Sequence, residues 1–334
     1  MLKSPEPLSA RMLAELKAIA RPGALLLDPA DRWSYGYDNS RRQAMAQAVI
    51  LVETPEQVVP LVEFCNRERL PLVARGRGTG TTGATVPDRG GLVLSFERLD
   101  RIPLIDPDNR LAIVEPGVTN QALQQAAAAH GFFWPPDPTS AATCTLGGNL
   151  ACNAAGPRAV KYGTTRENTL GLTAVTGAGE LIRTGVRTTK GVVGYDLTRL
   201  IIGSEGTLAL ITQATLKLTP LAEARRTLRA SYADIHAAAA AVSAIMAQPV
   251  TPCALEFMDG SALAMARHVG DLGLPEVTLR WVADNLEALL RLAPSAALRQ
   301  RVLALADWSS AALPANDQSA VKARMKRLAS IERM

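Results

Sequence analysis

Apolar residues recur at two different spacings along the first 220 residues, and each spacing predicts its own kind of element. Residues 8–20 place apolar side chains three or four positions apart, which is helical spacing, and Pro22 and Gly23 follow. We therefore predict an N-terminal packing helix over residues 8–20. Residues 33–42 are polar and contain two tyrosines, which predicts a loop.

A second helix is expected to begin sharply at Thr54. This residue can serve as the N-cap, with Pro55 at the first helical position and Gln57 three residues after the cap, which is the capping-box pattern. Pro60 lies inside the same helix, where the missing N–H predicts a kink or a late start. A third helix is expected after a cap at Thr119.

Short apolar runs and alternating runs predict strands between these helices. The expected strands cover residues 48–52, 70–74, 92–96, 111–114, 170–175, 180–183 and 208–218. Residues 190–197 look like a turn-rich bridge into a short helix, and residues 233–246 form an alanine-rich helical stretch. Strands and helices therefore mix along the chain, which predicts an α+β fold.

One long stretch, residues 135–156, fits neither pattern. It is poor in charge and rich in glycine, proline, threonine and asparagine, so a helix would be weak there and a strand would not tolerate its prolines. We expect an ordered loop. It is either an Ω-loop held by its own turns, or a wall whose small side chains let backbone N–H groups approach a polar ligand.

A second glycine-rich stretch, residues 75–83, follows a predicted strand, and its last six residues match the dinucleotide pattern G-x-G-x-x-G. Glu97 and Asp100 stand roughly where that pattern has its ribose-binding acid. A Rossmann unit needs a helix at the third glycine, but Pro87 and another predicted strand follow instead. The stretch is therefore expected to join strand to strand and to bind phosphate through consecutive N–H groups.

Composition predicts no further helices or strands, but it limits the kind of core and the classes of partner that the chain can have. The chain has 334 residues, of which 48% are hydrophobic and 4% aromatic, so its core should be large and aliphatic. The formal charge of +5 is modest and spread along the chain, which indicates a solvated surface and no nucleic-acid partner. Arg75 and Arg77 are likewise expected to face solvent, with added charge for a phosphate-bearing cofactor as the alternative.

No segment reads as a leader or a membrane span. Residues 1–20 carry charges and proline where a signal peptide needs an apolar run, and no later run approaches the length of a span. A cytoplasmic location is therefore expected, with attachment at the periphery of the inner membrane left open.

The cysteines and His130 are expected to have structural roles. Neither a C-x-x-C spacing nor a nearby histidine completes a zinc pattern, so the cysteines read as reduced, small apolar residues: Cys65, Cys144, Cys152 and Cys253. His130 follows a predicted helix, and we read it as a helix-end cation rather than a catalytic base.

Four separated motifs agree with one family. These are residues 75–83, residues 136–156 with Leu-Gly-Gly-Asn and Asn-Ala-Ala-Gly, the Lys-Tyr-Gly step at 161–163, and residues 190–211 with Gly-Tyr-Asp-Leu and Gly-Ser-Glu-Gly-Thr-Leu. Together they resemble the FAD-binding domain of the p-cresol methylhydroxylase and vanillyl-alcohol oxidase type. Within that family, the sequences of these motifs are most similar to those of the FAD-linked glycolate oxidase catalytic subunit and of D-lactate dehydrogenases.

The resemblance implies a domain organisation. Residues 1–44 would form an N-terminal helix and loop, residues 45–220 two α/β subdomains clasping an extended FAD, and residues 221–275 the start of a substrate cap domain. Residues 276–334 would be a helical tail of uncertain assignment, so that the cap is partial and mostly helical.

The same resemblance assigns cofactor-binding residues position by position. The pyrophosphate would be cradled by Gly76, Gly78, Thr79, Gly80, Thr81 and Gly83. The ribityl chain and flavin would be lined by Asp137, Thr143, Gly147, Gly148, Asn153, Ala155 and Gly156. Three residues would complete the flavin site: Gly206, Thr207 and Ile211. Thr79 takes the place of a histidine that tethers the flavin in some relatives, so the FAD should be non-covalent.

The C-terminal part departs from the family. Residues 254–259 resemble the strand that opens the cap, but beyond about residue 275 the likeness fades. His268 is the only histidine after His236, so the family's metal-binding histidine pair cannot be assembled there. Apolar residues at helical spacing predict helices over residues 282–290, 298–305 and 321–328. Basic residues lie beside the third apolar stripe, and we read them as a solvent-exposed face.

Three functions remain open on this basis. The leading hypothesis is an FAD-dependent oxidoreductase that oxidises a small 2-hydroxy acid of the glycolate or D-lactate type by hydride transfer to the flavin. An electron-acceptor or oxidase-complex subunit is a candidate partner, and no catalytic residue is assigned because the base would come partly from the cap. The alternative is a non-enzymatic flavin-binding or subunit-interaction protein with a truncated cap. The third hypothesis, a nicotinamide-dependent Rossmann dehydrogenase, rests only on the match to the G-x-G-x-x-G pattern.

Overall fold

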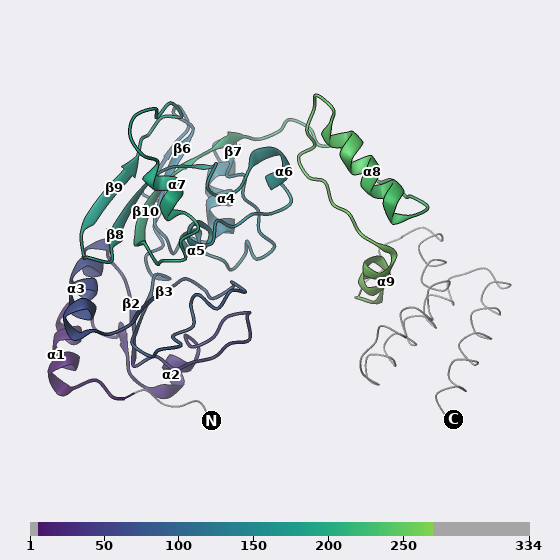
Figure 1. The fold of residues 1–334 in the computed structure, drawn as a ribbon. Coiled ribbons are helices and arrows are strands. Elements are labelled where there is room, and N and C mark those ends of the chain that lie inside the picture. Colours follow the sequence, from purple (N-terminus) through teal and green to yellow (C-terminus); the bar gives the residue numbers. More distant parts are fainter. Residues whose placement is uncertain (1–5, 270–334) are drawn as a thin grey trace, which may run out of the picture. The chain divides into compact units, whose positions relative to one another are not determined.

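Two sheets organise the first part of the chain (Figure 1). The structure is a computed structural model that describes residues 6–269. The chain divides into two units, of which the first holds residues 1–229 and 245–255, and the second holds residues 230–244 and 256–334. The predicted domain boundaries remain a prediction.

The first sheet is mostly parallel. Its strand order is β1-β2-β4-β3, with β2 and β3 parallel to β4 and β1 antiparallel to β2. The strands are β1 (Leu25–Leu26), β2 (Ala48–Leu51), β3 (Leu72–Arg75) and β4 (Leu92–Ser95). Parallel strands need a crossover, and α3 (Val58–Glu68) provides it between β2 and β3. Helices α1 (Ala10–Ile19) and α3 pack together, and the short α2 (Pro29–Trp33) precedes β2.

The start of the crossover confirms the capping prediction. The Thr54 and Gln57 capping box is present, and its first turn is the 3-10 helix η1 (Pro55–Gln57). The α-helix proper begins only at Val58, which is the late start that Pro60 predicted.

The second sheet is antiparallel throughout. Its order is β5-β6-β10-β8-β9. The strands are β5 (Leu104–Asp106), β6 (Leu111–Val114), β8 (Thr169–Thr176), β9 (Leu181–Gly185) and β10 (Ala209–Lys217). The helices of this region are α4 (Asn120–Ala128), α5 (Leu146–Ala151), α6 (Ala159–Tyr162) and α7 (Leu197–Ile201). A small ribbon pairs β7 (Phe132–Phe133) with β11 (Thr219–Pro220).

Each of the two sheets packs on its own hydrophobic core, and the first core also contains residues of the second sheet. The first core gathers the buried residues of α1, β2, α3 and β4, and it also includes Val175 from β8 and Leu210 from β10. The second core surrounds Trp134, which is fully buried and donates its indole N–H to the Asn168 carbonyl oxygen at 3.0 Å. Because second-sheet residues belong to the first core, the two sheets of this unit are in contact through it.

The expectation of a purely irregular loop at residues 135–156 is wrong at one point, because α5 lies within it. The Thr145 side chain accepts a hydrogen bond from the Gly148 N–H at 3.3 Å and so caps this short helix. Leu146 and Leu150 are fully buried in the second core. Tertiary packing therefore stabilises a helix that intrinsic propensity disfavours.

The second unit contains α8 (Ile235–Met246) up to residue 244, and α9 (Gly260–Val269). The strand expected at residues 254–259 is absent from the structure, which assigns no regular element there. A strand needs a partner, and instead Asp259 accepts a hydrogen bond from the Ala262 N–H at 2.7 Å, which marks the start of α9. The helical stripes expected beyond residue 281 lie outside the described residues.

Within residues 6–269, none of the helices combines the length and the apolar character that crossing a bilayer requires.

Candidate cofactor site

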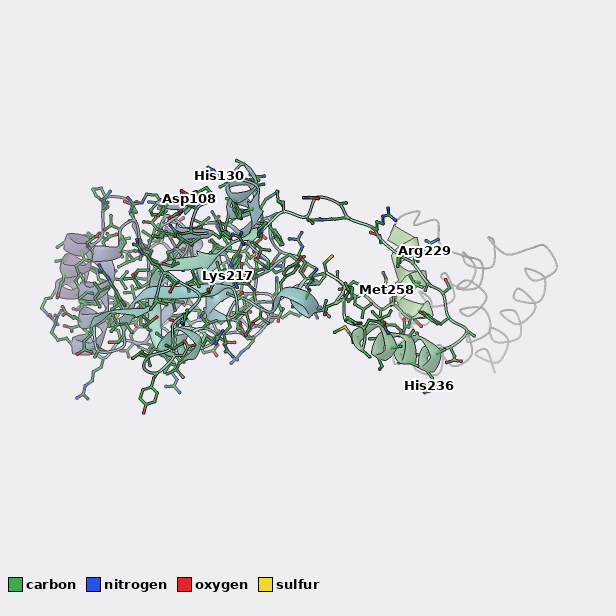
Figure 2. All side chains as sticks on the ribbon, turned by 90° about the horizontal axis from the view of Figure 1, so that it is seen from above. Asp108, His130, Lys217, Arg229, His236 and Met258 are labelled. Carbon is green, nitrogen blue, oxygen red and sulfur yellow. The ribbon has the colours of Figure 1, made fainter. Side chains whose placement is uncertain are left out.

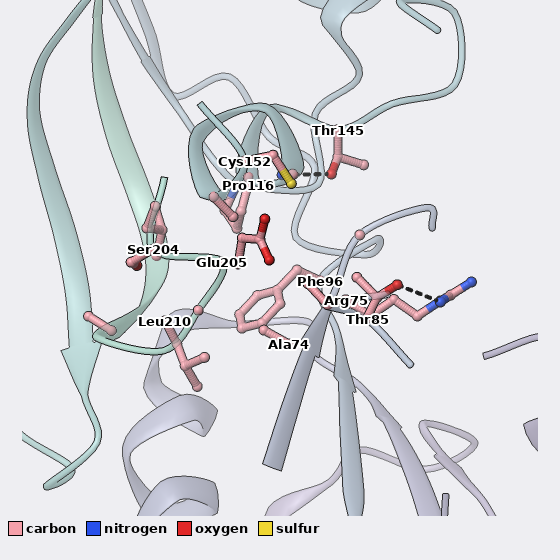
Figure 3. A pocket seen from close by; sticks show the side chains of 18 of the residues that line it. Ala74, Arg75, Thr85, Phe96, Pro116, Thr145, Cys152, Ser204, Glu205 and Leu210 are labelled. Atoms are coloured by element: carbon pink, nitrogen blue, oxygen red, sulfur yellow. Dashed lines mark hydrogen bonds between the residues drawn. The ribbon is translucent and has the colours of Figure 1, made fainter. Parts of the chain in front are cut away.

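A cavity lies within the first unit, where the ends of two first-sheet strands approach α5 and the turn before β10 (Figure 3). The first sheet contributes Ala74 and Arg75 from β3, and Phe96 follows β4. The opposite wall comes from α5 and from the residues that lead from α7 into β10. Its walls therefore come from several segments that are far apart in the sequence.

Five of the predicted cofactor residues line this cavity. They come from the first glycine loop, from α5 and from the second glycine turn: Gly76, Gly147, Gly148, Gly206 and Ile211. The structure thus brings together in space three of the four motifs that carried the family resemblance, and the Lys-Tyr-Gly step at 161–163 is not among the lining residues.

Two of these glycines are needed for close packing. A Cβ on Gly76 would collide with the Thr145 hydroxyl, and a Cβ on Gly147 would lie 2.6 Å from Pro116 Cβ. The absence of a side chain lets the first loop, α5 and the Pro116 turn approach each other. Gly206 differs, because the atom nearest to a Cβ added there would be Ala74 Cβ at 3.5 Å, which is an ordinary contact distance.

The rest of the first glycine loop lies beside this cavity rather than in its lining. Residues 78, 79, 80, 81 and 83 are not among the lining residues. Within the described part of the chain, the N–H groups of residues 77–82 donate to no protein acceptor. Consecutive N–H groups without partners suit an anion such as a diphosphate.

Arg75 corrects one expectation about this loop. We predicted that it faces solvent, but only 5% of it is exposed. Its guanidinium donates to the Ser34 carbonyl oxygen at 3.1 Å and to Thr85 Oγ1 at 3.2 Å (Figure 3). Burial lowers the pKa of this guanidinium, while nearby Asp38 opposes the shift. Arg77 is exposed as expected, and its guanidinium pairs with Glu97 at 3.3 Å.

The other predicted flavin residues do not line the cavity. Asp137 accepts from the Arg158 backbone N–H at 3.1 Å, and Gly156 is needed where the chain packs against Asp137. Asn153 Oδ1 accepts from Thr164 Oγ1 at 2.7 Å and from Arg166 N at 3.0 Å. The hydroxyls of Thr143 and Thr207 donate to backbone carbonyls three residues earlier in the chain, and Ala155 is exposed.

Five polar residues that sequence reasoning missed do line the cavity: Thr85, Thr145, Cys152, Ser204 and Glu205. The Ser204 Oγ atom is buried and has no partner among the described residues, so it is available to a ligand. Glu205 and the next residue, Gly206, both have a left-handed backbone, with φ of 53° and 79°, so the chain turns sharply at this point of the lining. The sequence Gly-Ser-Glu-Gly predicted a turn, but it did not show in which direction the Ser204 and Glu205 side chains point.

The cysteine expectation holds only in part. All four cysteines are free, but Cys152 and Cys253 are exposed rather than packed as small core residues. Desolvation and the nearby Glu205 carboxylate raise the pKa of the Cys152 thiol (Figure 3). The thiol is therefore less readily ionised than a free cysteine.

His130 stands after α4 at the surface, and it is not among the residues that line the cavity (Figure 2). Its position gives no support for a catalytic role.

Comparison with known proteins assigns this arrangement to a family. Residues 46–185 match the family model described as "FAD binding domain", and residues 221–308 match "FAD linked oxidases, C-terminal domain". The chain belongs to the FAD-linked oxidases. Its fold is the p-cresol methylhydroxylase type of FAD-binding domain, followed by a region that matches the oxidase C-terminal domain.

Curated relatives support the assignment. The chain is 43% identical over 247 residues to the glycolate oxidase subunit GlcD of Bacillus subtilis, which covers 74% of this chain and 53% of that protein. It is 39% identical to a D-lactate dehydrogenase of Archaeoglobus fulgidus, over 75% of this chain and 54% of the relative. It is 33% identical to a D-2-hydroxyglutarate dehydrogenase of Stutzerimonas stutzeri, over 79% and 57%. The chain spans about half the length of the relatives it matches.

Solved structures share the fold. An alkyldihydroxyacetonephosphate synthase superposes with a TM-score of 0.69 at 20% identity, over 87% of this chain and 55% of that one. At this identity the likeness concerns architecture alone.

FAD is the cofactor of this FAD-linked oxidase domain, and the residues present fit it. The six unpaired N–H groups suit its diphosphate, and the largely aliphatic cavity with the unpaired Ser204 hydroxyl suits a ring system with polar edges. The Rossmann alternative is wrong, because the glycine loop runs from β3 to β4 without an intervening helix.

Proposed function

We propose that this chain is an FAD-dependent oxidoreductase that oxidises a small 2-hydroxy acid of the glycolate or D-lactate type. The observation that carries the proposal is the agreement among relatives, because a glycolate oxidase subunit, a D-lactate dehydrogenase and a D-2-hydroxyglutarate dehydrogenase all match it at 33–43% identity. Each of their named substrates carries a hydroxyl beside a carboxylate. The three share that chemistry while differing in the rest of the molecule.

The chain's own residues have separate parts in this function. The N–H groups of residues 77–82 hold the diphosphate, and the glycines of α5 and of the turn at 203–206 allow the cofactor close to the backbone. Bound FAD supplies the two-electron acceptor for the oxidation. Phe96, Ile201 and Leu210 line the cavity and make much of its wall apolar, which suits the flavin ring system.

Electrons are expected to pass to a protein or quinone acceptor. One relative is named as a subunit of a glycolate oxidase, so association with oxidase-complex subunits belongs to the same proposal. A cytoplasmic location, in contact with the inner membrane where such acceptors are found, is consistent with it.

The test is an anaerobic reduction of the purified protein. A flavin spectrum with bands near ~370 and ~450 nm is expected, and these bands should bleach when glycolate, D-lactate or D-2-hydroxyglutarate is added. L-Lactate serves as the stereochemical control, because the relatives named for lactate and hydroxyglutarate act on D-acids.

The possible outcomes separate the competing readings. Bands that bleach with one of the D-acids or with glycolate support the enzyme. Bands that persist with each of these acids favour the non-enzymatic flavin-binding protein, and a protein that binds no flavin overturns both.

A further inference from the structure

A short segment that precedes the matched FAD-binding domain wraps the first glycine loop. Residues 34–42, here called the strap, lie ahead of residue 46, where the match to the family model begins. The strap nevertheless bonds to residues 75, 79, 80 and 83, which span the glycine loop from end to end. This concentration of contacts is unexpected for a linker.

The strap holds two carbonyl groups of the loop. The Asn39 backbone N–H donates to the Gly80 carbonyl oxygen at 2.9 Å, and Asn39 Nδ2 donates to the Thr79 carbonyl oxygen at 3.2 Å. One residue therefore binds two consecutive peptide groups of the loop.

These bonds also determine where the neighbouring N–H groups point. In a planar trans peptide the C=O and N–H groups point in opposite directions, and the described residues contain no cis peptide. With the carbonyls of Thr79 and Gly80 turned toward the strap, the N–H groups of Gly80 and Thr81 are turned away from it. Both of these N–H groups are among those without a protein acceptor in the described part of the chain.

Asp38 fixes the far end of the loop. Its side chain is buried, with the residue 5% exposed, and Oδ2 accepts from the Gly83 N–H at 2.9 Å. Its other oxygen accepts from the Ser40 N–H at 2.8 Å, which holds the carboxylate in place. Asp38 thus occupies the N–H of Gly83 and marks the end of the unpaired series.

We propose that the strap is part of the FAD site, with Asp38 and Asn39 as positioning residues for the diphosphate. The strap binds the carbonyl side of the glycine loop, so that the N–H side is presented to the phosphates without rearrangement. The inference rests on FAD binding, which the proposed function shares, but not on the oxidation of a 2-hydroxy acid.

Release of FAD from the purified holoprotein tests this role. The rate is followed after dilution by the recovery of free-flavin fluorescence in wild type, Asn39→Ala and Asp38→Asn. Loss of one such hydrogen bond should speed release about tenfold. Asp31→Asn is the matched control, because Asp31 is an exposed carboxylate nearby on α2 that makes no hydrogen bond to the loop.

Two further readouts separate positioning from a general loss of structure. The urea midpoint of each flavin-free variant should stay close to that of wild type. The ³¹P NMR shifts of the bound FAD should move in Asn39→Ala but not in Asp31→Asn, because only the former changes the N–H groups around the phosphates.

The outcomes distinguish failure of the strap proposal from failure of the proposed reaction. Release rates within twofold of wild type, or unchanged ³¹P shifts, would overturn the proposal, as would a loss of FAD fully explained by a lower urea midpoint. A wild-type protein that binds FAD but oxidises no 2-hydroxy acid would refute the proposed reaction and leave the strap unaffected.

Discussion

At the scale of single residues, two adjacent glycines of α5 have different surroundings. A Cβ on Gly147 would lie 2.6 Å from Pro116 Cβ and 3.0 Å from the Pro116 carbonyl oxygen. On Gly148 the nearest atom would be Thr145 Oγ1 at 3.4 Å, which is an ordinary contact. Helix propensity favours alanine over glycine at both positions, so packing alone decides the difference between them.

The same substitution is therefore expected to have opposite effects at these two positions. Gly148→Ala should stabilise the flavin-free protein by about 0.5–1 kcal/mol, the usual gain in a helix. Gly147→Ala should destabilise it by about 1–3 kcal/mol, the usual cost of overpacking. Urea unfolding of both variants measures the two values, and effects of the same sign would refute the packing argument.

Cys65 gives a prediction about pH. Burial in the first core raises the pKa of its thiol from 9.0 to about 12. Above pH 9 the unfolded chain loses a proton that the folded chain keeps, so the free energy of unfolding falls as pH rises. The expected loss from this thiol between pH 8 and pH 10 is about 1.4 kcal/mol.

Cys65→Ala tests this by comparing the free energy of unfolding at pH 8 and at pH 10. The variant should lack the Cys65 share of the decrease, whereas Cys253→Ala, at an exposed position, should retain it. The range ends at pH 10 because burial and the hydrogen bond to Glu97 raise the pKa of Tyr35 from 10.0 to about 12, so that its own contribution to the loss of stability grows as the pH passes 10. The raised pKa of Cys152 contributes equally in wild type and in Cys65→Ala, so it cancels in the comparison. An unchanged pH dependence in Cys65→Ala would contradict the assignment.

At the scale of elements, the 3-10 turn at the start of α3 ties three segments together. The Gln57 side chain accepts from the backbone N–H groups of Glu53 and Thr54 at 2.9 and 3.0 Å, and it donates to the Ile19 carbonyl oxygen at the end of α1 at 3.0 Å. The sequence predicted the cap but not the bond to α1.

Gln57→Ala should therefore cost more than an ordinary helix cap. It leaves three backbone groups without their partner, so a loss of about 2–4 kcal/mol is expected in urea unfolding. Gln121→Ala, at an exposed position on α4, is the control and should change stability by less than about 0.5 kcal/mol. A loss at Gln57 no larger than in the control would show that these bonds contribute nothing net.

The local patterns predicted most elements because each depends on neighbours in sequence. The alternation at 208–218 and the capping box at Thr54 required no knowledge of distant residues. Helix α5 escaped prediction because its stability comes from burial of Leu146 and Leu150 in a core built by remote strands. Arg75 was misjudged for the same reason, since its partners Ser34 and Thr85 are brought to it only by the fold.

The candidate site was predictable as motifs but not as a surface. Glycine spacing marked the loops, and the family resemblance supplied the cofactor. Which residues face the cavity depends on backbone direction, so Ser204 and Glu205 were missed. Asn153 and Asp137 do not line this cavity, and their assignment to the cofactor site stays a prediction. The strap was missed because a polar loop without a motif carries no signal of its partners.

At the scale of the whole molecule, the contacts available to FAD are many and individually weak. They are backbone N–H groups, small residues and a few hydroxyls, and the position of the tethering histidine in some relatives is occupied here by Thr79. Acid precipitation of the purified protein is therefore expected to leave FAD in the supernatant. Absorbance of the two fractions measures this, and a yellow pellet after washing would contradict non-covalent binding.

The sharing of one core by two sheets has a consequence for the lifetime of the complex. Val175 and Leu210 belong to the second sheet but are buried with the first, and Leu210 also lines the cavity. Parting the cavity walls would expose these side chains to water, which costs about 1.5–3 kcal/mol for each. Departure of the cofactor through such an opening should therefore become steeply faster with temperature.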